Sequence, residues 1–197
     1  GWDPNGVFSQ SSRKLNPKEN QHLMKLINVA SLCNTSKVIY DKHNKKYTII
    51  GDPTEAAFNV LGNKAKITNL KENKIEDLPF NASLKYRASL SKVSGKNNVC
   101  SVGAPEVVLN MCTHFLKKNS KKPLTENDEK QITSQIEELS KKGMRVLAIS
   151  YKLSEKDNKD LSEKEIKKMV FVGIVGIRDP PRPDVRTAIR KTHSAGI

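Results

Sequence analysis

The sequence is poor in aromatic residues and contains no long apolar run. Aromatic side chains account for 5% of the 197 residues and apolar side chains for 36%, against roughly 45% in an average globular domain when glycine is counted. No segment approaches the ~18–20 consecutive apolar residues of a membrane-spanning helix, and no charged start followed by an apolar segment marks a signal peptide. The composition predicts a domain with a lean core, still too apolar for a fully disordered chain.

Paired cysteines and metal-binding motifs are also missing. The three cysteines, Cys33, Cys100 and Cys112, show no C-x-x-C spacing, and the four histidines are scattered along the chain. Zinc and redox sites need such close pairs of ligands. We therefore expect three reduced, mostly buried thiols, as is usual in a cytosolic protein, and no metal site.

Basic residues are in large excess. Lys and Arg number 35 against 21 Asp and Glu, a formal net charge of +14, which raises the question of a nucleic-acid or membrane-surface partner. The basic residues are spread along the chain, few aromatics interleave with them, and no nucleic-acid motif is present, so we expect no nucleic-acid binding. Most of the surplus falls in segments that we expect to be solvated, namely 13–25, 37–46, 64–74, 117–122 and 152–168.

Apolar spacing and capping residues predict five helices. Asn16 and Asp52 can each cap a helix whose first turn begins with proline, and Thr125 with Asp128 resembles a capping box. Gly62 is expected to end the second helix. The predicted helices cover residues 17–33, 53–62, 105–112, 126–142 and 184–195.

Short β-prone runs between turn signals predict strands that pair mainly as hairpins. Polar residues at 41–46 and 95–97 form two of the expected turns, while 117–123 and 152–168 are interpreted as charged loops, the second with a helical piece. The predicted strands are 38–40, 47–50, a weak strand within 64–70, 87–93, 98–102, 145–151 and 170–177. This order predicts an α+β fold with a mainly antiparallel β-sheet flanked by helices.

The ends of the chain are expected to differ from its middle. Residues 1–16 lack periodicity and are interpreted as a leader or hinge segment, and residues 17–177 as the folded domain. The proline-rich segment 179–183 stops regular structure. Residues 178–197 are therefore expected to form a hinge and the start of a return into another domain.

No complete catalytic motif is present, but five short segments carry a family resemblance. They are Gly51–Phe58 (GDPTEAAF), Leu78–Tyr86 (LPFNASLKY), Gly103–Glu106 (GAPE), Lys142–Ala148 (KGMRVLA) and Val172–Pro183 (VGIVGIRDPPRP). In this order and spacing they resemble the nucleotide-binding domain of type II P-type ATPases, the cation pumps, over roughly residues 17–197. Each segment alone is a weak signal, and their combination is specific.

The resemblance implies roles at the adenine end of a nucleotide. Phe80 matches the aromatic residue on which adenine stacks, and Lys85 matches a pocket lysine near adenine and phosphates. Glu55 matches the acidic residue that accepts from the adenine amino group, and Asp52 is a weaker candidate at the same edge. From composition alone, Phe80 would be a core residue and Lys85 a solvated one, while Glu55 and Asp52 would serve the helix start.

The resemblance also implies roles beside the phosphates and at the hinge. Arg145 matches the phosphate-binding arginine, and guanidinium suits phosphate oxygens; Leu147 would line the adenine pocket or simply pack in the core. Gly103 would let the backbone approach the nucleotide, or serve as a turn glycine. Asp179, Pro180, Pro181 and Arg182 match the hinge to the phosphorylation domain, or form an ordinary linker.

One departure from the family pattern matters most, beside a second at Ala82, where some calcium pumps carry an arginine. The family carries Lys-Gly-Ala-Pro-Glu where this chain has Val102-Gly103-Ala104-Pro105-Glu106, so Val102 stands in place of the usual pocket lysine. A cation is thereby missing beside the nucleotide. We expect ATP binding weaker than is typical of the family unless another lysine, such as Lys85, compensates.

The resemblance implies a binding module of a larger enzyme. ATP would be the substrate, and its γ-phosphoryl group would pass to an Asp outside this chain, with Mg²⁺ bound in the parent pump but not by this chain alone. Expected partners are the phosphorylation and actuator domains of the same parent, an integral protein of the endoplasmic reticulum or plasma membrane, and the isolated domain is expected to be monomeric.

Several functional alternatives remain open at this point. Calcium is the favoured ion because the Gly-Ile-Arg-Asp-Pro-Pro-Arg-Pro segment looks like calcium pumps, whereas Phe80 to Tyr86 look more like sodium/potassium-type pumps. A regulatory domain that has lost nucleotide binding is a different class, supported by Val102. A basic nucleic-acid-binding module is the least favoured.

Overall fold

A seven-stranded sheet forms the centre of the computed structural model, which describes residues 2–67, 74–154, 160–178 and 184–196. Neighbouring strands run antiparallel except for one parallel pair, β11 with β8. Across the sheet the strands are β5 (Lys74–Asn81), β6 (Tyr86–Val93), β7 (Lys96–Gly103), β10 (Arg145–Ser154), β11 (Met169–Ile177), β8 (Cys112–Lys117) and β9 (Ser120–Pro123). The predicted α+β class with a mainly antiparallel sheet is confirmed.

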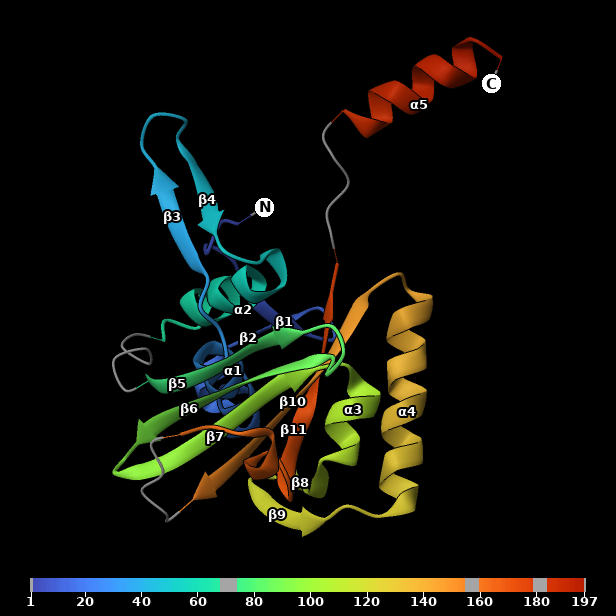
Figure 1. The fold of residues 1–197 in the computed structure, drawn as a ribbon. Helices are drawn as coiled ribbons and strands as arrows, with labels where there is room; N and C mark the ends of the chain where they lie inside the picture. Colours follow the sequence, from blue (N-terminus) through green and yellow to red (C-terminus); the bar gives the residue numbers. More distant parts are fainter. Residues whose placement is uncertain (1, 68–73, 155–159, 179–183, 197) are drawn as a thin grey trace.

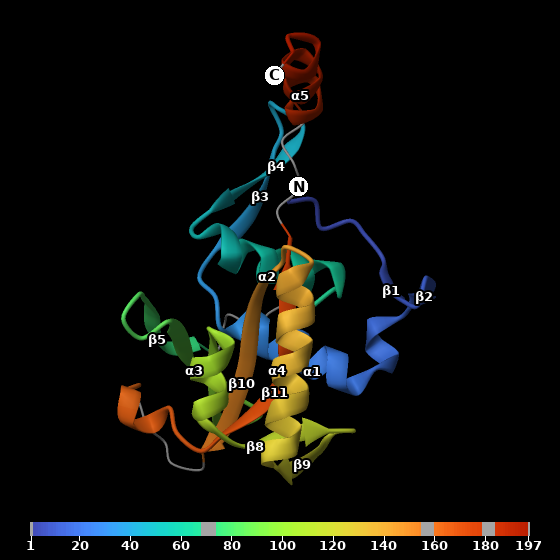
Figure 2. The same cartoon turned by 90° about the vertical axis from the view of Figure 1, so that its right-hand side faces the viewer.

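Helices cover both faces of this sheet (Figures 1 and 2). On one face lie α1 (Gln21–Leu32) and α2 (Pro53–Lys64), and on the other α3 (Pro105–Asn110) and α4 (Glu126–Lys141). Two apolar clusters fill the layers, one around Phe58 and Ile149 beneath α1 and α2, and one around Leu90, Val108 and Met169 on the α3 and α4 side. Burial of these side chains supplies the main driving force for folding.

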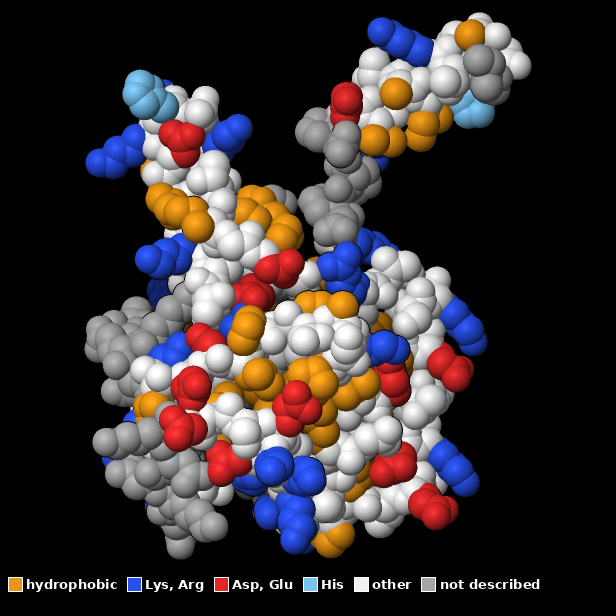
Figure 3. Space-filling view, in the orientation of Figure 1, with side chains coloured by type: hydrophobic (Ala, Val, Ile, Leu, Met, Phe, Trp, Pro, Cys, Tyr) orange, Lys and Arg blue, Asp and Glu red, His pale blue; other side chains and the backbone are white. Residues whose placement is uncertain are grey.

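Two short hairpins and a final helix complete the described structure. The first hairpin joins β1 (Phe8–Gln10) to β2 (Arg13–Leu15), within residues expected to lack regular structure. The second joins β3 (Lys37–Asp41) to β4 (Lys46–Ile50), as predicted, and projects from the body with exposed hydrophobic side chains (Figures 1 and 3). Helix α5 (Val185–Ser194) follows at the C-terminal end, close to its predicted position.

Three helix boundaries differ from the prediction. Helix α3 ends at Asn110 instead of 112, because Cys112 already begins β8. Asn16 and Pro17 begin a 3₁₀ turn (Pro17–Glu19), and α1 begins afresh because the side chain of Asn20 accepts a hydrogen bond from the Leu23 amide. Gly62 does not end α2, which continues to Lys64. An added Cβ at Gly62 would lie 2.5 Å from the Ser31 hydroxyl oxygen, so this glycine permits close packing of α1 on α2.

Several strand predictions also need correction. Residues 117–123 are not a loop, because β8 and β9 form a hairpin through Lys118 and Asn119, both with positive φ. Strand β10 extends to Ser154, and the turn between β6 and β7 lies at 94–95 rather than at the predicted 95–97. The weak strand expected within 64–70 is not seen at 64–67, where α2 ends, and its remainder lies outside the described residues.

Three further expectations concern the cysteines, membrane-spanning helices and the start of α4. All three cysteines are reduced and buried, as predicted, and burial raises the pKa of the Cys33 thiol to about 11. Within the described ranges, no helix has the length and apolar character needed to cross a membrane. Helix α4 begins with the predicted capping box, formed by Thr125 and Asp128.

Candidate functional site

The first turn of α2 lies where several of the predicted site residues meet. It follows Gly51, whose φ of +102° turns the chain out of β4, and it begins with Pro53. The Asp52 carboxylate accepts hydrogen bonds from the amides of Thr54 (2.8 Å) and Glu55 (3.1 Å). Asp52 therefore caps the helix, and this role alone accounts for its presence.

Two arginines from the sheet hold this turn. Arg145, at the start of β10, donates from Nη1 to the Thr54 hydroxyl at 2.8 Å. Arg87, in β6, forms an ion pair with Glu55. Sequence analysis identified Arg145 and missed Arg87. The sequence signal for Arg87 is weak, because the strand Tyr86–Val93 carries two basic residues, Arg87 and Lys92, and neither position by itself reveals an inward-facing charge.

Glu55 is held on both carboxylate oxygens. Its Oε2 accepts from the Thr35 amide at 2.7 Å and from the Thr35 hydroxyl at 3.0 Å, and its Oε1 faces Arg87. Arg87 also reaches Asp77 at 3.2 Å, and Asp77 pairs with Lys74 at 2.8 Å. Two carboxylates and two cations thus form a continuous row of ion pairs from Glu55 through Arg87 and Asp77 to Lys74, and such pairing is what lets buried charges persist.

Phe80 and Lys85 lie at the turn between β5 and β6. The Phe80 ring is 61% exposed, so the interpretation of Phe80 as a core residue is wrong. Lys85 has a φ of +57°, and its ammonium group lies 3.8 Å from Glu106 in the first turn of α3. Both side chains of this pair are exposed, so it is weak and easily exchanged for another anion.

Gly103 is required by the backbone around it. An added Cβ would lie 2.4 Å from the Tyr86 Cβ and 2.5 Å from the Lys85 carbonyl oxygen. The next amide, that of Ala104, donates to the same carbonyl at 2.9 Å. Gly103 therefore lets the end of β7 approach the β5–β6 turn closely, which is neither a simple turn role nor evidence of contact with a ligand.

Val102 and Leu147 both belong to the core on the α1 and α2 side. Val102 is 5% exposed and lies directly opposite Arg87 in the β6–β7 pair. Leu147 is partly buried and packs against the same apolar cluster. The core interpretation of Leu147 is thus supported, and the position of the expected lysine is occupied by an apolar side chain beside a buried arginine.

A cavity of about 740 Å³ runs along α2. Its volume is within the range typical of small-molecule sites. Asp52 and Arg145 line it together with Thr54, Phe58 and Arg178, whereas Glu55, Phe80 and Lys85 are not among its lining residues. Asp52 and Arg145 thus form one group at this cavity, and Phe80 and Lys85 form a second group at the β5–β6 turn.

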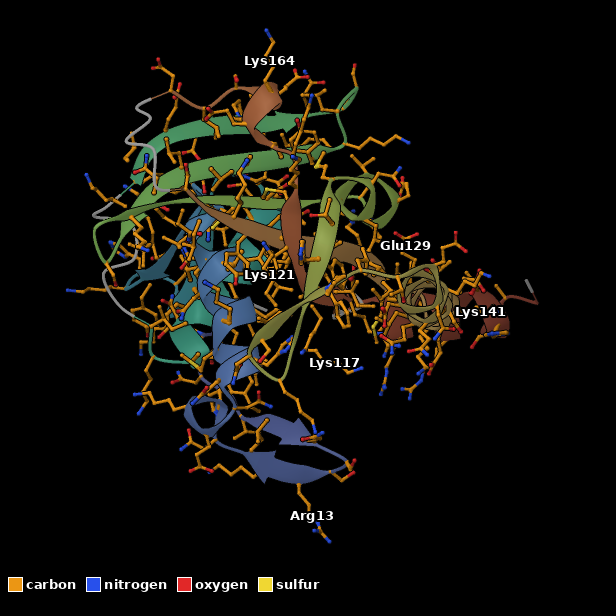
Figure 4. The ribbon with its side chains drawn as sticks, turned by 90° about the horizontal axis from the view of Figure 1, so that it is seen from below. Arg13, Lys117, Lys121, Glu129, Lys141 and Lys164 are labelled. Atoms are coloured by element: carbon orange, nitrogen blue, oxygen red, sulfur yellow. The ribbon has the colours of Figure 1, made fainter. Side chains whose placement is uncertain are left out.

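Much of the surplus positive charge lies away from both groups. Figure 4 shows Lys117 and Lys121 on the β8–β9 hairpin and Arg13 on the β1–β2 hairpin, pointing outward. Strand β9 is at the opposite edge of the sheet from β5. These lysines therefore act as solvated surface residues, as expected for the segment 117–122.

Two further predictions concern a metal site and the hinge residues. In the described part of the chain, no three or more His, Cys, Asp or Glu residues cluster so that they could hold a metal ion. The predicted hinge residues Asp179, Pro180, Pro181 and Arg182 lie outside the described residues.

Comparisons with known proteins agree on one family. A family model described as "P-type ATPase, cytoplasmic domain N" matches residues 22–184. A calcium-transporting ATPase of Bacillus subtilis is 25% identical over 100% of this chain and 22% of its own length. Calcium-transporting ATPase lmo0841 of Listeria monocytogenes is 30% identical over 88% of this chain and 20% of its own length.

A relative named for other ions matches as well. The sodium/potassium exporting P-type ATPase cta3 of Schizosaccharomyces pombe is 31% identical over 95% of this chain and 19% of its own length. The chain spans about a fifth of the length of the curated relatives it matches.

Proposed function

The chain belongs to the P-type ATPase cytoplasmic domain N family, and on this premise we propose that it binds the adenosine end of ATP beside the first turn of α2. The folded domain is residues 17–177, and segments 1–16 and 178–197 lead to other domains of a parent pump. The observation that carries the proposal is Phe80, a large aromatic ring held 61% exposed at the end of β5, where a core role would bury it.

Phe80 offers a flat face for adenine. Base–aromatic stacking contributes about 1–3 kcal/mol per base in single-stranded nucleic-acid binders, and its physical basis applies to a nucleotide base as well. The neighbouring turn adds Lys85, whose exposed pair with Glu106 can exchange for a phosphate oxygen. The base and at least one phosphate can therefore be bound from the same turn.

Arg145 extends the site toward the phosphates. A guanidinium group carries five N–H donors in a planar fork, and one donor of Arg145 is used by Thr54. The others remain for phosphate oxygens, which guanidinium binds in bidentate fashion. Because Arg145 also lines the 740 Å³ cavity, we place the phosphates beyond the one bound by Lys85 on the cavity side of α2, and the base on the β5–β6 side.

The chemistry of phosphoryl transfer belongs to the parent. The nucleophilic Asp and the Mg²⁺ that the family uses would come from another domain, so this chain positions ATP and is expected not to hydrolyse it efficiently alone. The parent is proposed to be a cation-transporting pump in which this domain works on the cytosolic side, beside the phosphorylation and actuator domains.

Calcium is the ion that we propose for the parent. The support is that the Bacillus and Listeria relatives are named as calcium-transporting ATPases. A sodium or sodium/potassium pump is the second candidate, favoured by the name of the Schizosaccharomyces relative. The residues that select an ion lie outside this chain, so transport by the full-length pump in vesicles is the measurement that separates the two.

Titration of the domain with ATP tests the binding proposal. Phe80→Ala should weaken ATP binding roughly 5- to 150-fold, the equivalent of about 1–3 kcal/mol of stacking, without lowering the unfolding temperature, because the ring is largely exposed. Isothermal titration calorimetry gives the affinity. Tyr40→Ala, which removes an exposed ring on the β3–β4 hairpin, is the matched control and should bind ATP normally.

Three results would contradict the proposal. One is equal ATP affinity in the wild type and Phe80→Ala. A second is salt-dependent binding to duplex DNA that ATP does not affect, which would favour the nucleic-acid-binding alternative. The third is the absence of any ATP binding, which would favour the regulatory alternative.

A further inference from the structure

We propose that Arg87 is a positioning residue for base recognition. It fixes Glu55 at the adenine edge, and it supplies beside Glu55 the positive charge that is missing because Val102 stands in place of the usual lysine. The inference rests on the proposed function, since it assigns how the same site selects its base. It concerns a residue that the sequence did not single out and that the sheet register brings into the site.

The first step is the burial of Arg87. It is 4% exposed, yet it carries a full charge in β6 and pairs with Glu55 and Asp77. Its Nε is buried and has no hydrogen-bond partner among the described residues. A buried charge is costly unless it is paired. The carboxylates of Glu55 and Asp77 therefore fix the position of Arg87, and Arg87 in turn fixes theirs.

The second step is the number of acceptor positions on Glu55. A carboxylate offers about four lone-pair positions. Two of them are taken by the Thr35 amide and hydroxyl on Oε2, and one by Arg87 on Oε1. Among the described residues, one position on Oε1 has no donor, and the side chain is 15% exposed. Glu55 is therefore held so that it can accept one more N–H donor, such as the amino group of adenine.

The third step is the sheet register. Arg87 and Val102 are direct partners across β6 and β7, so their side chains share one face of the sheet, with Cβ atoms about 4.5–5.5 Å apart. A basic side chain from either strand therefore enters the same space beside Glu55. The structure places that charge on β6, and a lysine added at position 102 would lie against Arg87.

The base selectivity of the domain tests this assignment. Inosine triphosphate carries a carbonyl oxygen, an acceptor, where ATP carries the amino donor, so a fixed Glu55 carboxylate should favour ATP. We expect Arg87→Gln to weaken ATP binding about tenfold or more, the size of one charge-assisted hydrogen bond, and to leave inosine triphosphate nearly unchanged. Calorimetric affinities for both nucleotides give the ratio.

Rescue and control variants separate positioning from general damage. Val102→Lys alone should destabilise the domain, because like charges would face each other across the strands. Combined with Arg87→Gln, it restores a cation to the same space and should recover most of the ATP preference. Arg87→Lys should retain part of it, and Arg13→Gln, the same substitution at an exposed arginine, should change nothing.

Each outcome has a defined meaning. If Arg87→Gln remains folded, as judged by thermal unfolding, and keeps the wild-type ratio of ATP to inosine triphosphate affinity, the inference is overturned while the proposed function stands. If Arg87→Gln does not fold, the double variant decides by the same ratio. If the wild type binds no ATP, the proposed function fails, and this inference fails as well because it rests on that function.

Discussion

Single residues show how few side chains define the first turn of α2. Asp52 caps it, Arg145 holds Thr54, and Arg87 holds Glu55. Of these, Arg145 and Glu55 followed from family-like motifs, whereas Arg87 follows only from the register that sets it opposite Val102. A one-residue shift between β6 and β7 would turn Arg87 to the other face of the sheet, so no local sequence pattern could identify it.

Gly103 carries the clearest prediction for a single side chain. Gly103→Ala should lower the free energy of unfolding by about 1–3 kcal/mol. The new Cβ would lie within 2.6 Å of the Cα and Cβ atoms of Tyr86 in β6, so one of the two strands would have to move. Urea unfolding measures the change. Gly6→Ala is the matched control, since its Cβ would meet only the end of the flexible Lys64 side chain. An unchanged unfolding midpoint for Gly103→Ala would contradict this reading of Gly103.

Whole elements differ in how well local sequence determines them. Helix α4 and the β3–β4 hairpin were predicted closely because their signals, a capping box and a polar turn between β-branched runs, lie within the elements themselves. Strand β5 was missed because Pro79 argues against a strand interior. Its position at the sheet edge and the irregular register between Leu78 and Asn81 accommodate the proline.

Strand β9 was missed for a related reason. All four of its residues are exposed, and two are lysines, so it shows no apolar alternation. Lysines on an edge strand discourage pairing with other molecules. A sequence that protects an edge in this way resembles a basic loop, and only the pairing with β8 distinguishes the two.

The capping box of α4 gives a prediction at the level of an element. Thr125→Ala should lower the free energy of unfolding by about 1 kcal/mol, because the Asp128 amide at the helix start loses its acceptor. Thermal unfolding monitored by circular dichroism measures this. Thr133→Ala, the same change in the exposed interior of α4, should be neutral or stabilising, since alanine favours helix. Equal destabilisation by both variants would argue against a capping role.

Across the whole molecule, stability should be distributed unevenly. The β3–β4 hairpin projects from the body and exposes Ile39, Tyr40 and Ile50, whereas β7 and β10 lie inside the sheet with helices on both faces. Amide hydrogen exchange should therefore be faster in β3 and β4 than in β7 and β10. Exchange followed by mass spectrometry on peptides from each pair tests this, and comparable protection of the hairpin would show that its contacts with α2 anchor it more firmly than its exposure suggests.

The large net charge is also a property of the whole molecule rather than of the site. The lysines of β8 and β9 lie at the sheet edge opposite to β5, and the row of ion pairs from Glu55 to Lys74 is balanced, with Arg87 and Lys74 against Glu55 and Asp77. The +14 therefore gives the domain a general field that attracts anions. Recognition depends on a few side chains near α2.

The cavity along α2 brings together two distant parts of the chain, since both Trp2 and Arg178 line it. The described unit between these residues is thus a long excursion that returns close to its starting point. The entropic cost of inserting a segment into a loop rises only slowly with the length of the segment. Because its two ends lie close together, this unit could be inserted into a host polypeptide at a cost close to that of a short surface loop. Such a geometry suits transplantation of the unit into an unrelated scaffold with little disturbance to either partner.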